Sequence, residues 1–476
     1  MAHYNFTSDI AIGLEIHITL DTNSKLFCGC ASKPAGNETG SYDGPNTRIC
    51  PVCLGHPGSK PVLNKKAVDY ALRLCSALKC RISPELIFSR KTYFYPDMAK
   101  NYQITQYEIP LGTGGKLRLG SGKEISITRV HIEEDPASLV HEGSHCLVDY
   151  NRSGVPLCEI VTEPELTSPE EAREFMKRLI AILQYLEIFE SSAIIKADAN
   201  ISIKGTGYVR QEIKNITGFK EIERALSYEV GRQKKLFSEG RKLAQSTLGW
   251  DSGKGTTFMM RSKETEEDYG YILDSDLVKT EITGEWLSDI QKEMPELPED
   301  KKQKFISRHG ISPLDAEVIS QEKKLACMFE KIAEEIDPML AAKWLRRELV
   351  RVMNFNRQAF NGLLIDESHM IELLSMVEKK EITEQTAQKI LEKLAVEPFS
   401  PIDYVKKNKL QAVSDTKELE KICIKVIDEN LKVAEDYKKG NEKSLHFLVG
   451  QVMRNTKSKA DPKIVNELLK RYLKTS

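Results

Sequence analysis

The chain has 476 residues, a net charge of −1 and 40% hydrophobic residues, a composition that excludes disordered and fibrous proteins. It is too long for one ordinary core, so two or three domains are expected. No apolar run approaches the roughly 20 residues of a membrane-spanning helix, and the first residues, MAHYNFTSDI, show no signal-peptide pattern. Ten cysteines in such a chain favour metal-bound or buried thiols over disulfides. We therefore expect a cytoplasmic protein without membrane association.

Charge is distributed unevenly along the chain. Residues 401–476 carry 17 Lys and Arg against 11 Asp and Glu, a balance of +6, so the preceding residues carry −7. A basic end on an acidic body suits a protein that holds a polyanion at one end and cations at the other. A lysine-rich helical tail kept soluble by its charge explains the same pattern.

The first clear element is an alternating segment at residues 12–21. Leu14, Ile16 and Ile18 share one face of the predicted strand, and Glu15 and His17 share the other. Residues two apart on a strand point the same way, about 6–7 Å from each other. The Glu and His therefore suit metal ligation or acid–base chemistry, and they equally suit a solvated strand face.

Two close cysteine pairs follow on a segment rich in Gly, Pro and Asn. Cys28 and Cys30 form a CxC pair, and Cys50 and Cys53 form a CxxC pair nineteen residues later. Four thiolates at these spacings can hold zinc and pin a loop too polar to form its own core. Free buried thiols are the alternative. A redox pair is disfavoured, because redox CxxC motifs usually open a helix after a strand.

The segment at residues 131–166 is strongly acidic. Arg152 is its only Lys or Arg. Its eight carboxylates are Glu133, Glu134, Asp135, Glu142, Asp149, Glu159, Glu163 and Glu165. Prolines and glycines divide it into short extended pieces, on which unbalanced carboxylates repel one another unless a cation or proton lies among them. Apolar residues between the acids favour a half-buried divalent-metal site over a solvated acidic surface.

A predicted hairpin at residues 196–214 adds a second polar set. Asp198 and Asn200 alternate with apolar residues on one strand, and Glu212 and Lys214 share a face of the return strand. A three-residue loop would place Asp198 opposite Lys214 and Asn200 opposite Glu212, and a bulge would shift this pairing by one residue. Such a face can serve a metal and a phosphate together, or it can be solvated.

Helices are predicted where caps and apolar periodicity coincide. The predicted ranges are 64–79, 168–187, 223–239, 315–335 and 338–353. Between the first two, residues 88–107 interleave cations such as Lys91 with aromatic side chains, which suits a base, a phosphate or an aromatic core with charged edges. From about residue 295 the chain is predicted to be helical, with a further boundary at residues 398–401.

Several carboxylates, a His, a Lys and an Asn on strand faces favour metal-dependent chemistry. No G-x-S-x-G elbow and no P-loop frame occurs in the sequence. Carboxylates with a divalent metal and a Lys are what phosphoryl transfer needs, since Mg²⁺ offsets charge on a triphosphate. If the acceptor is a carboxylate, the product is an acyl phosphate that ammonia can attack.

Segments spread in order along the whole chain carry a family resemblance. They are GLEIHITLDTNSKLFCGC, ICPVCLGHPGSKPVLN, RKTYFYPDMAKNYQITQYEIPL, HIEEDPASLVH, LVDYNRSGVPLCEIVTEPEL, DANISIK, QEIKNITGF and GNEKSLHFLVGQVMRNTKSKADPKIVNELLKRYL. Together they resemble the B subunit of the glutamine-dependent aspartyl/glutamyl-tRNA amidotransferase. The resemblance implies an α+β fold, with a cradle-shaped catalytic domain built on an antiparallel sheet (1–293), an all-helical domain (294–400) and a small helical tail domain that binds tRNA (401–476).

The activity implied by the resemblance is that of a carbon–nitrogen ligase with glutamine as amido donor. ATP and Mg²⁺ would phosphorylate the side-chain carboxylate of mischarged Asp-tRNA(Asn) or Glu-tRNA(Gln), and ammonia from an amidase A subunit would complete the amide. A small C subunit would make the complex a heterotrimer. Which tRNA is the substrate stays open.

The resemblance also implies roles for residues. Catalytic roles fall on Glu15, His17, Glu133, Glu134, Glu159 and Glu212. The implied Mg²⁺ ligands are Glu15, His17, Glu133, Glu134 and Glu212. The hairpin adds Lys214 as a catalytic residue, and the expected ATP or Mg²⁺ contacts are Asp198, Asn200, Arg152 and Lys91. Zinc ligation by Cys28, Cys30, Cys50 and Cys53 matches one branch of the family, whereas many members lack these cysteines.

Two other functions fit the same residues. One is a non-catalytic tRNA-binding scaffold whose acids hold a structural metal, and the other is a metal-dependent hydrolase or nuclease that works without glutamine or partners. Replacing Glu133 or Glu212 with Gln separates catalysis from scaffolding. Truncation after Lys439 would test whether the tail holds tRNA.

Overall fold

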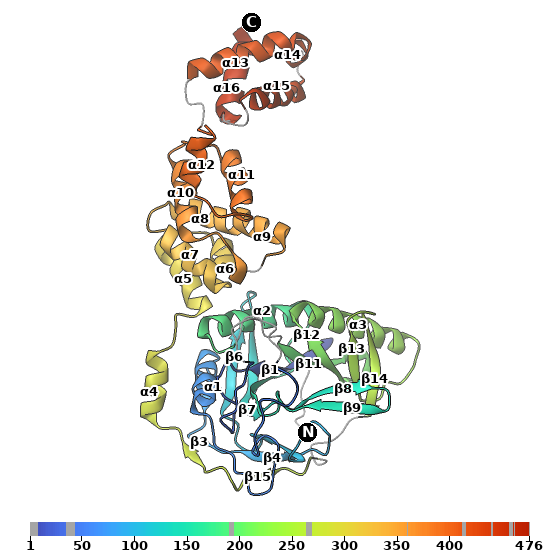
Figure 1. The fold of residues 1–476 in the computed structure, drawn as a ribbon. Helices are drawn as coiled ribbons and strands as arrows, with labels where there is room; N and C mark the ends of the chain where they lie inside the picture. The colour runs from blue at the N-terminus through green and yellow to red at the C-terminus, as the bar shows by residue number, and fades with distance from the viewer. Residues whose placement is uncertain are drawn as a thin grey trace. The chain divides into compact units, whose positions relative to one another are not determined.

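The computed structural model describes most of the chain. The described residues are 8–34, 43–189, 195–262, 269–358, 360–411, 416–438, 441–456, 460 and 462–475. The chain divides into two compact units, Met1–Leu297 and Pro298–Ser476, drawn in Figure 1. The division into three domains stays a prediction. No helix in the described ranges is long and apolar enough to cross a membrane.

The first unit is built on a nine-stranded sheet, which confirms the α+β fold class. The strand order is β14-β13-β12-β11-β1-β10-β7-β6-β2. Their bounds are β1 Ile10–Thr19, β2 Arg81–Ile82, β6 Gly112–Arg118, β7 Glu124–Glu134, β10 Pro156–Thr162, β11 Lys196–Ile203, β12 Gln211–Thr217, β13 Ser246–Asp251 and β14 Thr256–Ser262. Neighbouring strands are antiparallel except β12 and β13, which run parallel.

Strand β1 lies at the centre of this sheet and confirms the predicted alternation. It pairs with β10 on one side and β11 on the other, so both of its edges are hydrogen-bonded. Leu14, Ile16 and Ile18 are buried in the core of the first unit. Because successive side chains point to opposite faces, Glu15 and His17 are directed to the face that this core does not occupy.

Three helices cover the apolar face: α1 Lys65–Ala77, α2 Pro169–Leu186 and α3 Phe219–Ser238. Figure 1 shows α2 and α3 side by side along the sheet. The side-chain oxygens of Asn64 and Ser168 accept backbone N–H bonds at the starts of α1 and α2, as the capping pattern predicts. Helix α3 begins four residues before the predicted start at Glu223, because Gly218 with a φ of +84° ends the preceding strand there.

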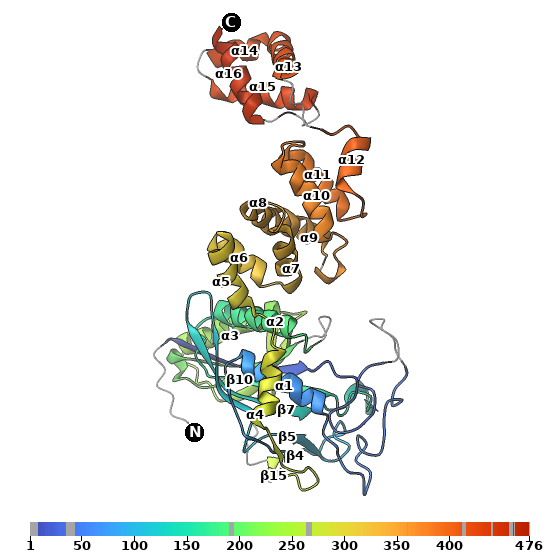
Figure 2. The same ribbon diagram turned by 90° about the vertical axis from the view of Figure 1, so that its left-hand side faces the viewer.

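Shorter elements complete the first unit. They are β3 Glu85–Leu86, β4 Ser89–Thr92, β5 Tyr102–Thr105, β8 Ser138–Glu142, β9 His145–Asp149, η1 Lys204–Thr206, β15 Ile272–Leu273, β16 Thr280–Glu281 and α4 Gly284–Lys292. Strands β8 and β9 form a hairpin inside the acidic segment, which therefore consists of short extended pieces as predicted. Helix α4 packs against α1, as Figure 2 shows, and the Trp286 indole N–H donates to Asp69 at 2.7 Å.

The described part of the second unit is helical. Its elements are α5 Pro298–His309, α6 Pro313–Ser320, α7 Lys323–Ile332, α8 Pro338–Lys343, η3 Trp344–Leu349, α9 Val350–Asn356, η4 Phe360–Gly362, α10 Glu367–Glu378, α11 Glu384–Leu394, α12 Pro401–Lys407, α13 Thr416–Glu429, α14 Leu431–Lys438, α15 Glu442–Asn455 and α16 Pro462–Thr475. Leu419 to Leu473 contribute a hydrophobic core of their own.

Two helix predictions in this unit need correction. The single helix predicted at 315–335 is two helices, because Glu322 has extended dihedral angles of φ −125° and ψ 111°. The helix predicted at 338–353 contains a π-helical segment at Trp344–Leu349 and continues to Asn356. Neither break has a Gly or Pro at that position to mark it.

Candidate functional site

One face of the large sheet carries a row of polar side chains from five neighbouring strands. In the register of the sheet, Glu15 lies opposite Asp198, and His17 lies opposite Glu159. Glu159 in turn lies opposite His131 on β7. Directly opposed residues on neighbouring strands project to the same face. The sheet thus gathers residues that lie more than 180 positions apart in the sequence.

A first group of cation ligands contains His17, Glu133 and Glu159, whose nearest ligand atoms lie within 4.8 Å of one another. The His17 Nε2 atom is 3.6 Å from a carboxylate oxygen of each Glu. The His131 Nε2 atom lies 3.1 Å from Glu159 and 3.7 Å from Glu133. Glu133 also accepts a hydrogen bond from the Thr105 hydroxyl at 3.2 Å. Both carboxylates are buried, so each is held in one orientation.

A second group contains Glu15, Asp198 and Glu212, again with ligand atoms within 4.8 Å. The Lys214 ammonium lies 2.9 Å from Asp198 and 2.8 Å from Glu212. Asn200 donates to Glu15 at 2.8 Å. The expected hairpin pairing of Asn200 with Glu212 is confirmed, and a bulge next to Asp198 displaces the pairing beyond it. Despite that bulge, Lys214 reaches Asp198 as the simple register predicted.

Proton affinities in the first group follow from burial and neighbouring charge. Burial opposes the charged form of His131, but the carboxylates of Glu159 and Glu133 outweigh it and raise the pKa of this imidazole to about 9. Burial acts to raise the pKa values of Glu133 and Glu159, and the two histidines outweigh it, so both pKa values are lowered. The group therefore holds two carboxylates against an imidazolium.

In the second group the balance differs between residues. Burial and the charges of Glu159 and Glu212 raise the pKa of Glu15. Burial would also raise the pKa of Glu212, but Lys214 more than offsets this and lowers it. The pKa of Lys214 is raised by Asp198 and Glu212 despite its burial. A proton on Glu15 and the ammonium of Lys214 thus balance part of the negative charge, a task that a bound cation performs equally well.

Three predicted residues lie outside both groups. Glu134 points away from Glu133, pairs with Lys100 and accepts the Ile104 backbone N–H at 2.8 Å. Arg152 donates to the backbone carbonyls of Pro136 and Ala137 at 2.8 and 2.7 Å, which holds the loop after β7.

The third, Lys91, lies on β4. Its ammonium is 4.6 Å from the centre of the Tyr269 ring, a cation–π distance. Roles for Lys91, Arg152 and Glu134 toward ATP or Mg²⁺ stay predictions.

The sequence reasoning missed His131, which contacts both carboxylates of the first group. A signal was present, because His131 and Glu133 are two residues apart on one strand, like Glu15 and His17. Thr247, which donates to Glu212 at 2.9 Å, gave no comparable signal, since β12 and β13 meet only in the folded sheet. Tyr271 was also missed: it stacks on Tyr107 with ring centres 3.9 Å apart, and burial followed by the charge of Glu133 raises its pKa.

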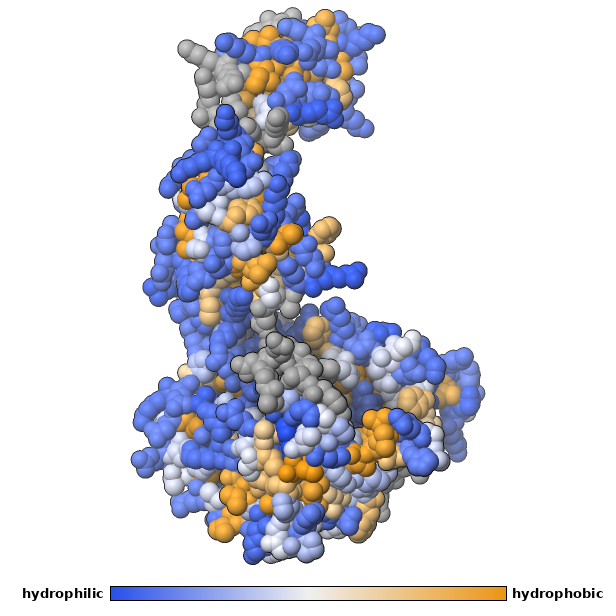
Figure 3. Space-filling model, in the orientation of Figure 1, coloured by the Kyte–Doolittle hydropathy of each residue, from blue (hydrophilic) through white to orange (hydrophobic). Residues whose placement is uncertain are grey.

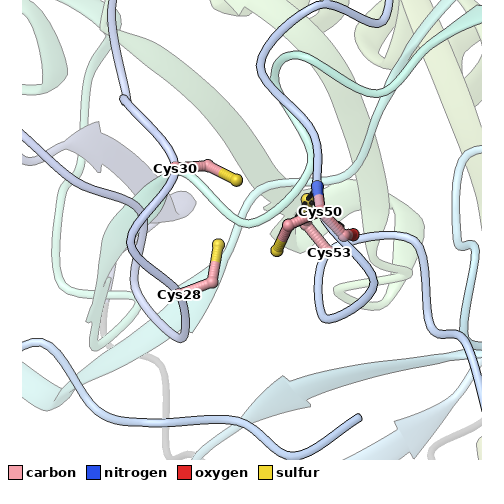
Figure 4. A group of neighbouring side chains, drawn as sticks. All are labelled: Cys28, Cys30, Cys50 and Cys53. Atoms are coloured by element: carbon pink, nitrogen blue, oxygen red, sulfur yellow. Dashed lines mark hydrogen bonds between the residues drawn. The ribbon is translucent and has the colours of Figure 1, made fainter.

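The four predicted zinc ligands lie together. The Sγ atoms of Cys28, Cys30, Cys50 and Cys53 are within 4.8 Å of one another. Figure 4 shows the sulfur atoms of the two pairs directed toward a common space between two loop segments. The Sγ atoms of Cys50 and Cys53 are 3.9 Å apart, close to the roughly 3.8 Å expected for two thiolates on one tetrahedral zinc with Zn–S bonds of about 2.3 Å. The donor set and its spacing therefore fit zinc.

The two acidic groups fit divalent cations of harder character. Carboxylate oxygens are preferred ligands of Mg²⁺ and Mn²⁺, and each group brings at least two carboxylates to one point. His17 adds a nitrogen ligand, which Mn²⁺ accepts more readily than Mg²⁺ does. The face can thus bind a cation in either group, with Lys214 beside the second.

Comparison with known proteins agrees with this site. A family model described as the GatB/GatE catalytic domain matches residues 10–288, and a model described as the GatB domain matches residues 327–473. The chain belongs to the GatB/GatE family. The catalytic-domain match contains both acidic groups and the cysteine cluster.

Full-length relatives in the GatB/GatE family are B subunits of one enzyme, the aspartyl/glutamyl-tRNA(Asn/Gln) amidotransferase. The chain is 43% identical to the B subunit from Caldanaerobacter subterraneus subsp. tengcongensis, over 98% of this chain and 99% of that protein. It is 41% identical to the corresponding protein of Carboxydothermus hydrogenoformans (97% and 98%) and 38% identical to that of Clostridium botulinum (97% and 98%). The resemblance seen in the sequence motifs is thereby confirmed.

Proposed function

We propose that this chain is the activating subunit of a tRNA-dependent amidotransferase. It phosphorylates the side-chain carboxylate of Asp on tRNA(Asn), of Glu on tRNA(Gln), or of both, with ATP and Mg²⁺. Ammonia then displaces the phosphate and leaves an amide. This makes the enzyme a carbon–nitrogen ligase with glutamine as the amido donor. The names of the full-length relatives support the substrate class.

The observation that carries the proposal is the pair of cation-ligand groups on one sheet face, with the Lys214 ammonium next to the second group. Phosphoryl transfer to a carboxylate brings several negative charges together, so positive charge must be available where they meet. The groups are Glu15, Asp198 and Glu212, and His17, Glu133 and Glu159. Mg²⁺ bound at either group would offset charge on the triphosphate and orient it.

Roles for individual residues follow from their contacts. Lys214 is the side chain beside the second group that is positively charged at every working pH, so we assign it to the transferring phosphate or to the substrate carboxylate. Asn200 fixes Glu15, Thr247 fixes Glu212, and His131 fixes Glu159. Such supporting bonds hold ligands in one orientation before the cation arrives.

The proposed partners are an amidase A subunit, which supplies ammonia, and a small C subunit. An acyl phosphate is lost to water unless ammonia arrives directly, so we expect the partner to cover the polar face. Val140 on β8 and Leu147 on β9 are more than half exposed, and Figure 3 shows hydrophobic surface over this hairpin. Exposed apolar surface of this kind suits a contact between subunits. The basic residues 401–476 are proposed to hold tRNA.

Zinc is proposed as a structural metal at the cysteine cluster, because four thiolates leave no position for a substrate. A cytoplasmic location stays a prediction.

The deciding experiment is amide formation on purified protein. The chain is supplied with mischarged tRNA, ATP, Mg²⁺ and ammonium chloride, with and without candidate A and C subunits, and Asn-tRNA or Gln-tRNA is measured. ATP-dependent product without the A subunit supports activation by this chain, and the tRNA that reacts names the substrate. A folded complex that yields no product from either tRNA contradicts the proposal.

A further inference from the structure

A fully buried lysine beside the cysteine cluster has no role in the proposed reaction. Lys25 has no exposed surface, a rare environment for an ammonium group unless it is paired. Its Nζ atom donates to the backbone carbonyls of Arg48 at 2.8 Å and Tyr150 at 3.1 Å. Within the described ranges, no carboxylate forms an ion pair with it. Two neutral carbonyls satisfy two of its three N–H groups and balance none of its charge.

The anions nearest to Lys25 along the chain and in space are the thiolates of the cluster. Lys25 is three residues before Cys28, and its backbone N–H donates to the Cys30 carbonyl at 2.9 Å. A Cβ built on Gly154 would lie 3.6 Å from Cδ of Lys25 and 3.8 Å from Cβ of Cys53, so these two side chains approach each other across Gly154. A hydrogen bond from Cys28 lowers the pKa of the Cys53 thiol to about 4 against the effect of burial, and the charge of Lys25 lowers it further.

A tetrathiolate site needs a compensating cation. Zn²⁺ with four thiolates carries a net charge of −2, and Cys53 is buried, so part of that charge lies away from water. Other cations around the loop are committed or solvated: Arg48 pairs with Asp43 at 3.1 Å, and the Lys60 side chain is 75% exposed. A buried charge acts more strongly than an exposed one at the same distance, because water does not screen it.

We propose that Lys25 is the counter-ion of the tetrathiolate zinc centre and that its charge sets the zinc affinity of this loop. The inference rests on the structural zinc proposed above. The same ammonium joins the metal loop, through Arg48, to the segment that enters β10, through Tyr150. The strand that carries Glu159 therefore begins beside a clamp that forms fully when thiolates and ammonium are both charged.

The test measures zinc on the full-length chain, independently of amidotransferase activity. Zinc content is read by mass spectrometry, and zinc affinity by competition with a chromogenic chelator. Lys25→Met removes the charge and the donors, Lys25→Gln keeps a neutral donor, and Lys25→Arg keeps the charge. Lys60→Met is the matched control, because it removes an exposed lysine from the pocket lined by Cys28 and Cys50.

Lys25→Met and Lys25→Gln are expected to weaken zinc binding by about tenfold or more, while Lys25→Arg and Lys60→Met stay within about threefold. In a chain whose four cluster cysteines are serine, Lys25→Met should lower the melting temperature less than it does in the wild type, because no anion then faces the lysine. Equal zinc affinity in Lys25→Gln and the wild type would overturn the role of Lys25 alone. A wild-type chain that retains no zinc would overturn the metal centre as well, and would leave the amidotransferase proposal untouched.

Discussion

Glu212 and Glu134 should respond in opposite ways to replacement by Gln. Glu212 belongs to a cation-ligand group beside Lys214, whereas Glu134 is adjacent to Glu133 in sequence but pairs with Lys100 on the other side of its strand. Glu212→Gln should therefore remove activation and spare the fold. Glu134→Gln should weaken the fold and spare activation per folded molecule.

The stability costs follow from the contacts. In Glu212→Gln, Lys214 keeps Asp198 at 2.9 Å and the Thr247 hydroxyl keeps a carbonyl acceptor. The Lys214 side chain is 28% exposed, so the loss is about 1 kcal/mol or less. In Glu134→Gln, Lys100 is left buried without a negative partner, which costs about 3–5 kcal/mol. A loss of that size lowers the melting temperature of a unit of this length by about 10 °C.

The catalytic costs are reversed. Losing one anionic ligand of the second group should reduce ATP-dependent amide formation at least about 100-fold, the effect of removing one charge-stabilising group from an active site. The assay compares ammonium-dependent product, tRNA affinity by filter binding, and thermal unfolding for wild type, Glu212→Gln and Glu134→Gln. Unchanged product formation in Glu212→Gln would refute the reasoning, as would a stable Glu134→Gln chain without activity, since that result would place Glu134 in the site.

Three further outcomes are expected. The pKa of His131 rises from its ordinary value of 6.5 to about 9, so its stabilisation is complete below pH 6.5 and lost as the pH rises through 9; urea unfolding in magnesium-free buffer should show His131→Gln less stable than wild type at pH 6 and similar to it at pH 9.5. Cys50→Ser should release zinc, measured by mass spectrometry, and increase hydrogen exchange at residues 148–154, which bond to the metal loop. Truncation after Lys439 would split the core that spans Leu419 to Leu473, so truncation after Leu410 is the cleaner test: it should weaken tRNA binding at least about tenfold and leave ATP binding unchanged.

Local elements and candidate residues were accessible from the sequence because they depend on short-range rules. Alternation at residues 12–21 identified which face of β1 carries Glu15 and His17, and the caps at Asn64 and Ser168 marked where two helices begin. Cysteine spacing identified a metal cluster, whose four Sγ atoms the fold does bring together. The family itself was legible in motifs that run the length of the chain.

The tertiary structure alone decided which candidates share a site. Glu133 and Glu134 are equivalent in sequence, yet the alternation of a strand directs one toward His17 and the other toward Lys100. The two cation-ligand groups exist because β1 lies between β10 and β11, an order that no local pattern encodes. The sequence by itself therefore determined the chemistry available to this protein. The order of strands in the sheet decided where that chemistry meets, because it sets which distant side chains face one another.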